Sequence, residues 1–249
     1  MSNRLAYILN NCLNIAQLRL GRIVSQPCLL CGTRTLGGPL CPDCRDDLPR
    51  LPATRCPICA LPTPAGEVCG ACLKRPPAFE RCRAAFAYAH PTDVLVQRLK
   101  YGAELTLAGF LAEQIVRAVD AADLPDLILP MPLHPRRLGE RGFNQAVEIG
   151  RRLATRLNVP LAVNACRRVR DTPAQAGLDL AERRRNMRGA FACTQTLNDR
   201  RIALLDDVMT SGASLNALAQ AARNAGAAGV EAWVVARTLR DDRRNPPTR

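Results

Sequence analysis

The sequence predicts an α/β protein with a mostly parallel sheet flanked by helices, preceded by a small cysteine-rich region. From about residue 83 onward, short apolar runs alternate with helical stretches, which is typical of a parallel sheet covered on both faces. Ten of the 12 cysteines lie between Cys12 and Cys82, where Pro and Gly are frequent and long periodic segments are few. We therefore divide the chain into four parts: a helix at 1–23, the cysteine-rich region at 24–82, the α/β domain at 83–240 and a basic tail at 241–249.

The elements of the α/β domain follow from its apolar periodicity. A helical pattern runs over 92–120 and breaks near Gly102, because glycine is a poor helix former. Further helices are expected at 143–157 and 213–225. Strands are expected at 84–89, 126–130, 161–165, 201–205 and 230–236.

The N-terminal segment predicts an amphipathic helix over residues 2–20 with Ser2 as its cap. Its apolar side is formed by Leu5, Ile8, Leu9, Cys12 and Ile15. No stretch reaches the roughly 18 to 20 apolar residues that span a bilayer, and no small-residue cleavage site follows the short apolar run. We expect no membrane span and a cytoplasmic protein whose cysteines stay reduced.

The charge predicts anionic partners. Thirty-five basic residues against 22 acidic ones give a net charge of +13 at pH 7, which favours phosphates, nucleic acid or acidic surfaces as ligands. Aromatic residues make up only 4% of the chain, which weighs against a nucleic-acid platform built on base stacking.

The cysteines form four CxxC units in a repeat. Adding 28 to the residue numbers of the first two units reproduces the last two. The eight residues are Cys28, Cys31, Cys41, Cys44, Cys56, Cys59, Cys69 and Cys72. Two CxxC turns complete a tetrahedron of thiolates, which zinc prefers, and four Cys ligands close the site, so we expect two structural zinc ions. Each would contribute on the order of 10 kcal/mol to a segment with almost no core.

Several alternatives stay open for these cysteines. The expected compartment disfavours disulfides, and an iron–sulfur cluster would use the same ligands. We pair adjacent knuckles, although Cys28 and Cys31 with Cys56 and Cys59 is also compatible with the spacing. The other four have no partner at ligand spacing and are expected to be small buried apolar residues; they are Cys12, Cys82, Cys166 and Cys193.

Residues 202–215 combine a short apolar strand, two acids, a hydroxyl-rich loop and the start of a helix. At the carboxyl end of a parallel strand, the free N–H groups of a helix N-terminus favour a phosphate. Gly212 lets the backbone approach closely, and Thr210, Ser211 and Ser214 add hydroxyl donors. Asp206 and Asp207, just before the loop, can accept hydrogen bonds from a ribose diol. Without a ligand, the same residues would be an acidic turn and a helix cap.

This stretch resembles the phosphoribosyl-diphosphate signature of type I phosphoribosyltransferases. Four more patches resemble the competence protein F (ComF) family, which joins N-terminal zinc knuckles to a type I phosphoribosyltransferase-like domain. They are 99–104 (LKYGAE), 130–146 (PMPLHPRRLGERGFNQA), 170–191 (RDTPAQAGLDLAERRRNMRGAF) and the cysteine region. The resemblance implies that Asp206 and Asp207 hold the ribose hydroxyls, with Mg²⁺ bound together with phosphoribosyl diphosphate. It implies that the substrate contacts Val208, Met209, Thr210, Ser211, Gly212, Ala213 and Ser214, of which 210–214 cradle the 5′-phosphate.

Two basic patches are expected to hold the pyrophosphate. Pro130, Pro132 and Pro135 favour an extended, turn-rich path. Three arginine forks that suit phosphate oxygens follow, and by position this patch resembles the pyrophosphate loop; they are Arg136, Arg137 and Arg141. Asn144 can orient phosphate or cap the following helix. The resemblance also makes Lys100 and Tyr101 contact candidates, although a lysine at a helix C-terminus equally fits the helix dipole.

The basic stretch 170–188 resembles the mobile loop that closes over the site in type I enzymes, where closure would exclude water. The residues that match the ComF pattern there are Thr172, Gln175, Arg183 and Asn186. The alternative without a functional role is a solvated helix with a basic face.

Two hypotheses of different class follow. In the first, the chain transfers a phosphoribosyl group, for which neither an acceptor nor a general base is evident. In the second, which the ComF resemblance implies, the chain handles incoming single-stranded DNA during natural transformation, beside a helicase-type partner. A sensor of phosphoribosyl diphosphate that also binds DNA would combine the two hypotheses. The alternative to a DNA role is a metabolic phosphoribosyltransferase acting on a nucleobase or an amine.

Overall fold

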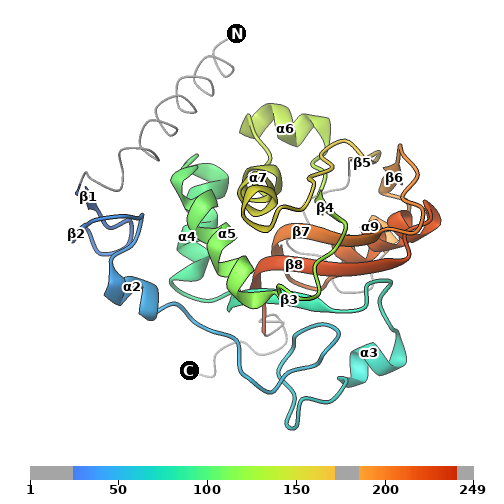
Figure 1. Ribbon diagram of the computed structural model, residues 1–249, viewed down its shortest axis with the longest axis horizontal. Coiled ribbons are helices and arrows are strands. Elements are labelled where there is room, and N and C mark those ends of the chain that lie inside the picture. Colours follow the sequence, from blue (N-terminus) through green and yellow to red (C-terminus); the bar gives the residue numbers. More distant parts are fainter. Residues whose placement is uncertain (1–24, 172–184, 240–249) are drawn as a thin grey trace.

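The centre of the molecule is a four-stranded parallel sheet in the order β3-β8-β7-β4 (Figure 1). The structure is a computed structural model that describes residues 25–171 and 185–239. The four strands are β3 (Cys82–Ala87), β8 (Gly229–Arg237), β7 (Arg201–Met209) and β4 (Leu127–Pro130). The predicted α/β class and parallel sheet are confirmed, since every neighbouring pair in this sheet is parallel.

Helices cover both faces of the sheet, and alternate strand residues serve the two faces. Leu205 and Trp233 pack with α4 (Thr92–Tyr101), α5 (Thr106–Ala118) and α7 (Gln145–Leu157). Leu204 and Val234 pack on the other face with α9 (Ala213–Asn224). These four helices confirm the predicted ones, and the predicted break falls at Gly102, which caps α4.

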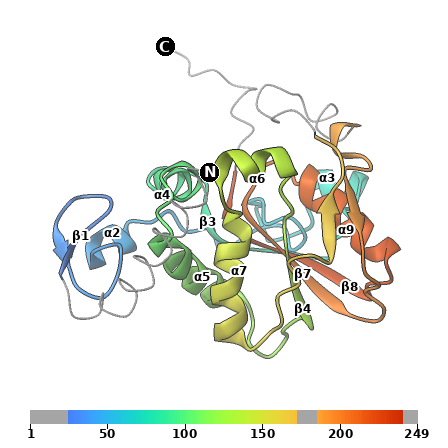
Figure 2. The same ribbon diagram turned by 90° about the horizontal axis from the view of Figure 1, so that it is seen from above.

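The cysteine-rich region contributes to both faces. Its elements are β1 (Gln26–Pro27), β2 (Arg34–Thr35), α2 (Pro42–Asp46) and α3 (Gly70–Lys74). Cys28 and Cys41 belong to the apolar cluster of α4 and α5, whereas Cys56 and Cys59 belong to that of α9. In Figure 2 the first cysteine cluster accordingly lies beyond α4 and α5.

Three predicted element boundaries are wrong. Residues 161–165 form no strand: only Leu161 makes a single parallel bridge, to Ile128, before the chain turns. The path through 130–146 is not extended throughout, because Pro135 occupies the first turn of a short helix, α6 (Pro135–Arg141). The strand predicted at 201–205 continues to Met209, so the two acids lie within β7 rather than after it.

The expectation for Cys166 and Cys193 is also wrong. They face each other in the antiparallel pair β5 (Cys166–Arg168) and β6 (Phe191–Cys193) and form a disulfide. Their separation of 27 residues hides the pairing in the sequence. Cys82 follows the expectation: it is a buried residue, and burial raises the pKa of its thiol to about 12.

Some predictions fall on residues outside the described ranges. These are the helix at 2–20 with Cys12, the tail at 241–249, and most of the loop-like stretch, including Thr172, Gln175 and Arg183. Among the described helices, none has the length and apolar character needed to cross a bilayer.

Candidate functional site

The acid pair and the hydroxyl-rich loop lie together at the carboxyl end of β7. The strand ends at Met209, and α9 starts at Ala213 behind the N-cap Gly212. Gly212 has a φ of +76°, which glycine adopts without steric cost. Ser211 Oγ accepts a hydrogen bond of 3.4 Å from the N–H of Ala213. The segment therefore turns sharply into a helix N-terminus, the arrangement that favours an anion.

Lys100 lies directly on the acid pair. Its Nζ is 2.5 Å from Oδ2 of Asp207, and the Asp207 residue is only 3% exposed. α4 supplies this lysine from its last turn, 107 positions before the acid in the sequence. The resemblance makes Lys100 a pyrophosphate contact, but here its ammonium neutralises Asp207.

Burial and neighbouring charges shift the pKa values of Asp206 and Lys100. Burial, followed by the Asp207 charge, raises the pKa of Asp206 well above its usual 3.8, and Lys100 opposes this rise. Burial by itself would lower the pKa of Lys100, but the Asp207 carboxylate outweighs it, so the pKa of Lys100 is raised. The ammonium is therefore the charged partner of two crowded carboxyls.

Tyr101 and Arg141, two further candidate residues, contact each other. Tyr101 is 77% exposed, and the Arg141 guanidinium lies over its ring, 5.3 Å from the centroid. Arg141 also donates a hydrogen bond to the buried Gln145 side chain. The two residues come from α4 and α6, so the structure brings together two of the sequence patches.

The other residues of the arginine patch have different partners. Arg136 pairs with Asp171 at 3.2 Å and with Glu140 at 3.4 Å. The Asn144 side chain accepts a hydrogen bond of 2.9 Å from the N–H of Ala146 and donates one of 3.0 Å to the Met131 carbonyl. Of the two roles expected for Asn144, the structure therefore displays the helix cap.

Two arginines near the site were missed by the sequence analysis. Arg168 on β5 feels the charges of Arg137, Asp171 and Asp206, and burial is the main cause of its lowered pKa. Arg237 at the end of β8 is 3% exposed and hydrogen bonds to the carbonyls of Met209 and Thr210. A charged residue that ends an apolar strand was the one available signal for Arg237.

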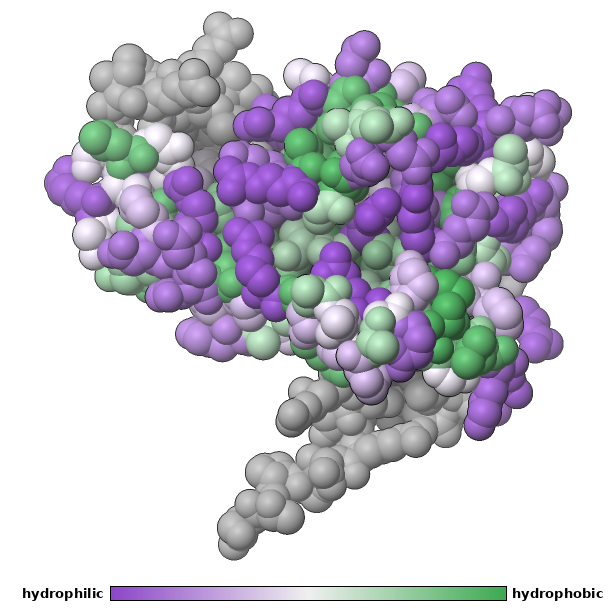
Figure 3. Space-filling model, turned by 60° about the horizontal axis from the view of Figure 1, so that its bottom comes forward, coloured by the Kyte–Doolittle hydropathy of each residue, from purple (hydrophilic) through white to green (hydrophobic). Residues whose placement is uncertain are grey.

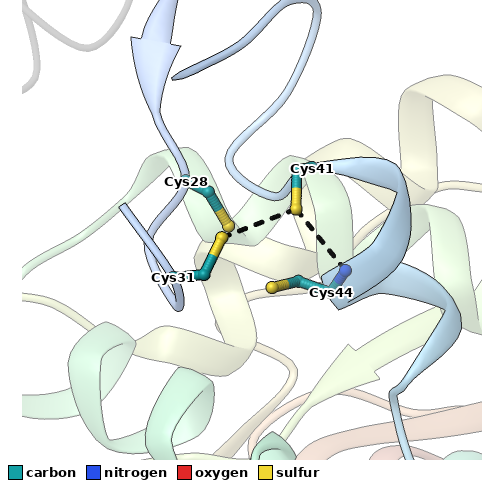
Figure 4. A group of neighbouring side chains, drawn as sticks. All are labelled: Cys28, Cys31, Cys41 and Cys44. Carbon is teal, nitrogen blue, oxygen red and sulfur yellow. Dashed lines mark hydrogen bonds between the residues drawn. The ribbon is translucent and has the colours of Figure 1, made fainter. Parts of the chain in front are cut away.

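The first four cysteines of the repeat form one cluster (Figure 4). Ligand atoms of Cys28, Cys31, Cys41 and Cys44 all lie within 4.8 Å of one another. The Sγ atoms of Cys31 and Cys41 are 3.7 Å apart, and the N–H of Cys44 donates to Cys41 Sγ at 3.5 Å. Adjacent knuckles are therefore paired, and the interleaved alternative is wrong.

The second cluster repeats the first. Ligand atoms of Cys56, Cys59, Cys69 and Cys72 again lie within 4.8 Å, and the Sγ atoms of Cys59 and Cys69 are 3.5 Å apart. Within the described parts of the chain, these two tetrads are the groups of three or more side chains that could hold a metal ion.

The chemistry of both tetrads fits zinc. Although burial opposes ionisation, backbone hydrogen bonds lower the pKa of Cys28 to about 6, while neighbouring Cys31 and burial raise that of Cys44. The other tetrad behaves alike, with the pKa of Cys56 lowered to about 7 and that of Cys72 raised. Four close thiols cannot all ionise without a cation, and four thiolates in a closed site are the ligands of structural zinc. The chain therefore carries two structural zinc sites.

The comparisons agree with this arrangement. A double zinc ribbon domain model matches residues 20–73. Competence protein F of Haemophilus influenzae is 34% identical over 178 residues, covering 68% of this chain and 78% of that protein. The DNA utilization protein YhgH of Escherichia coli K12 is 33% identical over 197 residues, covering 76% of this chain and 87% of that one. The fold and the two tetrads therefore define a class of protein that joins a double zinc ribbon to an α/β domain. The chain belongs to the competence protein F family.

Solved structures give a weaker likeness. Purine phosphoribosyltransferase from Pyrococcus horikoshii is 18% identical with a TM-score of 0.32, covering 54% of this chain and 83% of that one. UMP synthase from Leishmania donovani is 19% identical with a TM-score of 0.33, covering 57% of this chain and 24% of that one.

Proposed function

We propose that this chain binds phosphoribosyl diphosphate at the carboxyl end of β7 and acts in the handling of incoming single-stranded DNA in the cytoplasm. The observation that carries the first part is the acid pair on β7, which leads through a glycine turn into the N-terminus of α9. A sugar diol and a terminal phosphate five bonds away match carboxylates followed by free backbone N–H groups.

The roles of the residues follow from their chemistry. Asp206 and Asp207 accept hydrogen bonds from the ribose hydroxyls. The 210–214 backbone and the hydroxyls of Thr210, Ser211 and Ser214 bind the 5′-phosphate, and Val208 and Met209 supply the strand end. The pyrophosphate lies among cations, whose forks suit its oxygens; they are Lys100, Arg136, Arg137 and Arg141.

Mg²⁺ fits this site as a companion of the substrate. Because Asp207 Oδ2 already lies 2.5 Å from Lys100 Nζ, the acid pair offers few free oxygens to a resident ion. Diphosphate oxygens and water are the ligands that Mg²⁺ usually keeps, and the ion would neutralise charge on the departing pyrophosphate. Tyr101 and Arg141 offer a flat surface beside the sugar for a planar acceptor.

The first test is a calorimetric titration of phosphoribosyl diphosphate with Mg²⁺ into the zinc-loaded chain. Asp207→Asn is expected to weaken binding by about 100-fold, because charge-assisted hydrogen bonds contribute about 1.5–3 kcal/mol each. The matched control is Asp126→Asn, which makes the same chemical change beside the opposite end of the sheet, where Asp126 accepts a hydrogen bond from the N–H of Arg201. Equal affinities in the two variants would contradict the proposed site.

The DNA role is supported by the names of the relatives and by charge. The described surface in Figure 3 is mostly hydrophilic with scattered apolar patches, and the net charge is +13. The few aromatic residues favour contacts to phosphates rather than base stacking, so affinity should fall steeply with salt. The helicase-type partner implied by the family resemblance stays a prediction.

The second test measures single-stranded DNA affinity as a function of salt. We expect log K to fall by about 0.7 per unit of log salt for each phosphate neutralised. Asp207→Asn should leave this slope unchanged, although it is expected to weaken phosphoribosyl-diphosphate binding. Turnover with a nucleobase or amine, together with no DNA binding, would favour a metabolic phosphoribosyltransferase instead.

A further inference from the structure

Arg237 is a buried arginine that bonds to backbone carbonyls. Its Nε donates to the carbonyl of Cys59 at 2.8 Å. Its Nη1 donates to the carbonyl of Met209 at 2.9 Å, to that of Thr210, and to that of Thr238 at 2.8 Å. Among the described residues, Arg237 forms no ion pair with a carboxylate within 4.0 Å. The charge of Arg237 is therefore spread over carbonyl dipoles.

These carbonyls belong to two distant features of the chain. Cys59 is a ligand of the second zinc tetrad, 178 residues before Arg237. Met209 ends β7, and Thr210 is the first residue of the loop at 210–214, which we call the phosphate loop. A guanidinium is a rigid planar fork, so it holds its acceptors at fixed relative positions. One side chain thus joins the metal knuckle to the start of the loop.

Packing continues the same connection. Cys56, Cys59 and Met209 share one buried cluster with Ala213 and Leu215 of α9. The Met209 side chain lies 3.7 Å from the position that a Cβ on Gly212 would take. Protein interiors are close-packed and transmit displacement, so we expect a shift of the second tetrad to move the turn at Gly212 and with it the phosphate loop.

Within residues 25–171 and 185–239, no hydrogen bond joins the first tetrad to the loop at 210–214. Its backbone hydrogen bonds stay within its own segment: the N–H of Cys28 donates to Thr33, and the N–H of Arg45 donates to Cys41. It belongs to the cluster of α4 and α5, on the other face of the sheet. The duplicated knuckles therefore provide an internal comparison.

We propose that the second cysteine tetrad, when it holds zinc, positions the phosphate loop through Arg237, so that filling of this metal site sets the affinity for a phosphorylated ligand. Arg237 is a positioning residue: it touches the loop backbone and acts through it. The ligand in this inference rests on the proposed function, whereas the effect on loop geometry does not.

The experiment compares Cys69→Ser with Cys41→Ser in the full chain. These cysteines occupy equivalent places in the repeat, and each is the N-cap of a five-residue helix. Zinc content, amide hydrogen exchange of residues 206–216 and the Kd for phosphoribosyl diphosphate with Mg²⁺ are measured. Each variant should hold one zinc per chain. Only Cys69→Ser should speed loop exchange and raise the Kd, each by about tenfold or more.

A second pair of variants addresses Arg237 itself. Arg237→Met should raise the Kd and the loop exchange rate, and Arg237→Lys should restore part of both, since an ammonium keeps the charge but not the fork. Both should retain two zinc ions per chain. A fall in Tm without any change in loop exchange or Kd would overturn the proposal, as would equal loop effects of Cys69→Ser and Cys41→Ser. Loop exchange that responds as expected in a chain that does not bind the probe would support the coupling and overturn the proposed ligand.

Discussion

Removal of zinc is expected to unfold residues 25–81 of this chain. The region has only short elements, and many of its buried side chains are the cysteines themselves, with Leu40, Leu48 and Phe79 as the large apolar ones. Without metal, each tetrad loses on the order of 10 kcal/mol of metal-linked folding free energy, which so small a core cannot replace. Chelation followed by amide hydrogen exchange should show full loss of protection over this region.

The control for this experiment is re-addition of zinc. Two equivalents per chain should restore protection, and Cys44→Ser or Cys72→Ser should each lower the content to one. Because the tetrads are separate, neither variant should empty both sites. Retained protection at 25–81 in the metal-free chain would contradict the structural role of the ions.

Substitution of Lys100 by Met is expected to destabilise the chain by about 3 kcal/mol at pH 7, because it leaves the buried Asp207 carboxylate without its cation. Chemical unfolding measures this free energy. In the double variant Lys100→Met/Asp207→Asn most of the loss should be recovered, since the uncompensated charge is gone. A double variant as unstable as the single one would show that Lys100 contributes through packing alone.

The loss caused by Lys100→Met should shrink as the pH falls. The folded-state pKa of Asp206 is raised above 3.8, so the folded chain binds this proton more tightly than the unfolded chain. Its contribution to stability is fully present below about pH 3.8 and is lost as the pH rises through the raised pKa. Without the ammonium that opposes this rise, the pKa of Asp206 moves further up, and the pH dependence extends to higher pH. Adding Asp206→Asn to Lys100→Met should make the free energy of unfolding depend less on pH. An unchanged pH dependence would contradict the assignment to Asp206.

The zinc tetrads show how far local spacing reaches. A CxxC turn brings its two thiols together by local geometry alone, so the eight ligands could be named from the sequence. Which turns meet is a matter of chain path, and both pairings fitted the spacing. The structure pairs Cys28 and Cys31 with Cys41 and Cys44 because the nine residues between them close a short loop.

The disulfide and the strand wrongly predicted at 161–165 show where apolar periodicity does not predict the structure. Cys166 and Cys193 have unremarkable positions in the sequence, and only the antiparallel pairing of β5 with β6 brings them together. Residues 161–165 have the apolar character of a strand, but only one bridge to Ile128 forms, since a strand needs a partner along its whole length.

The α/β class, the main helices, the four core strands and the acid pair with its hydroxyl-rich loop could be predicted from the sequence, because periodicity, turn residues and ligand spacing are local properties of the chain. The contact of Lys100 with Asp207 and the hydrogen bonds by which Arg237 joins Cys59 to Thr210 became visible with the folded structure. Such contacts link residues far apart in the chain, and the order and direction of the strands, rather than any local pattern, bring them within hydrogen-bond distance.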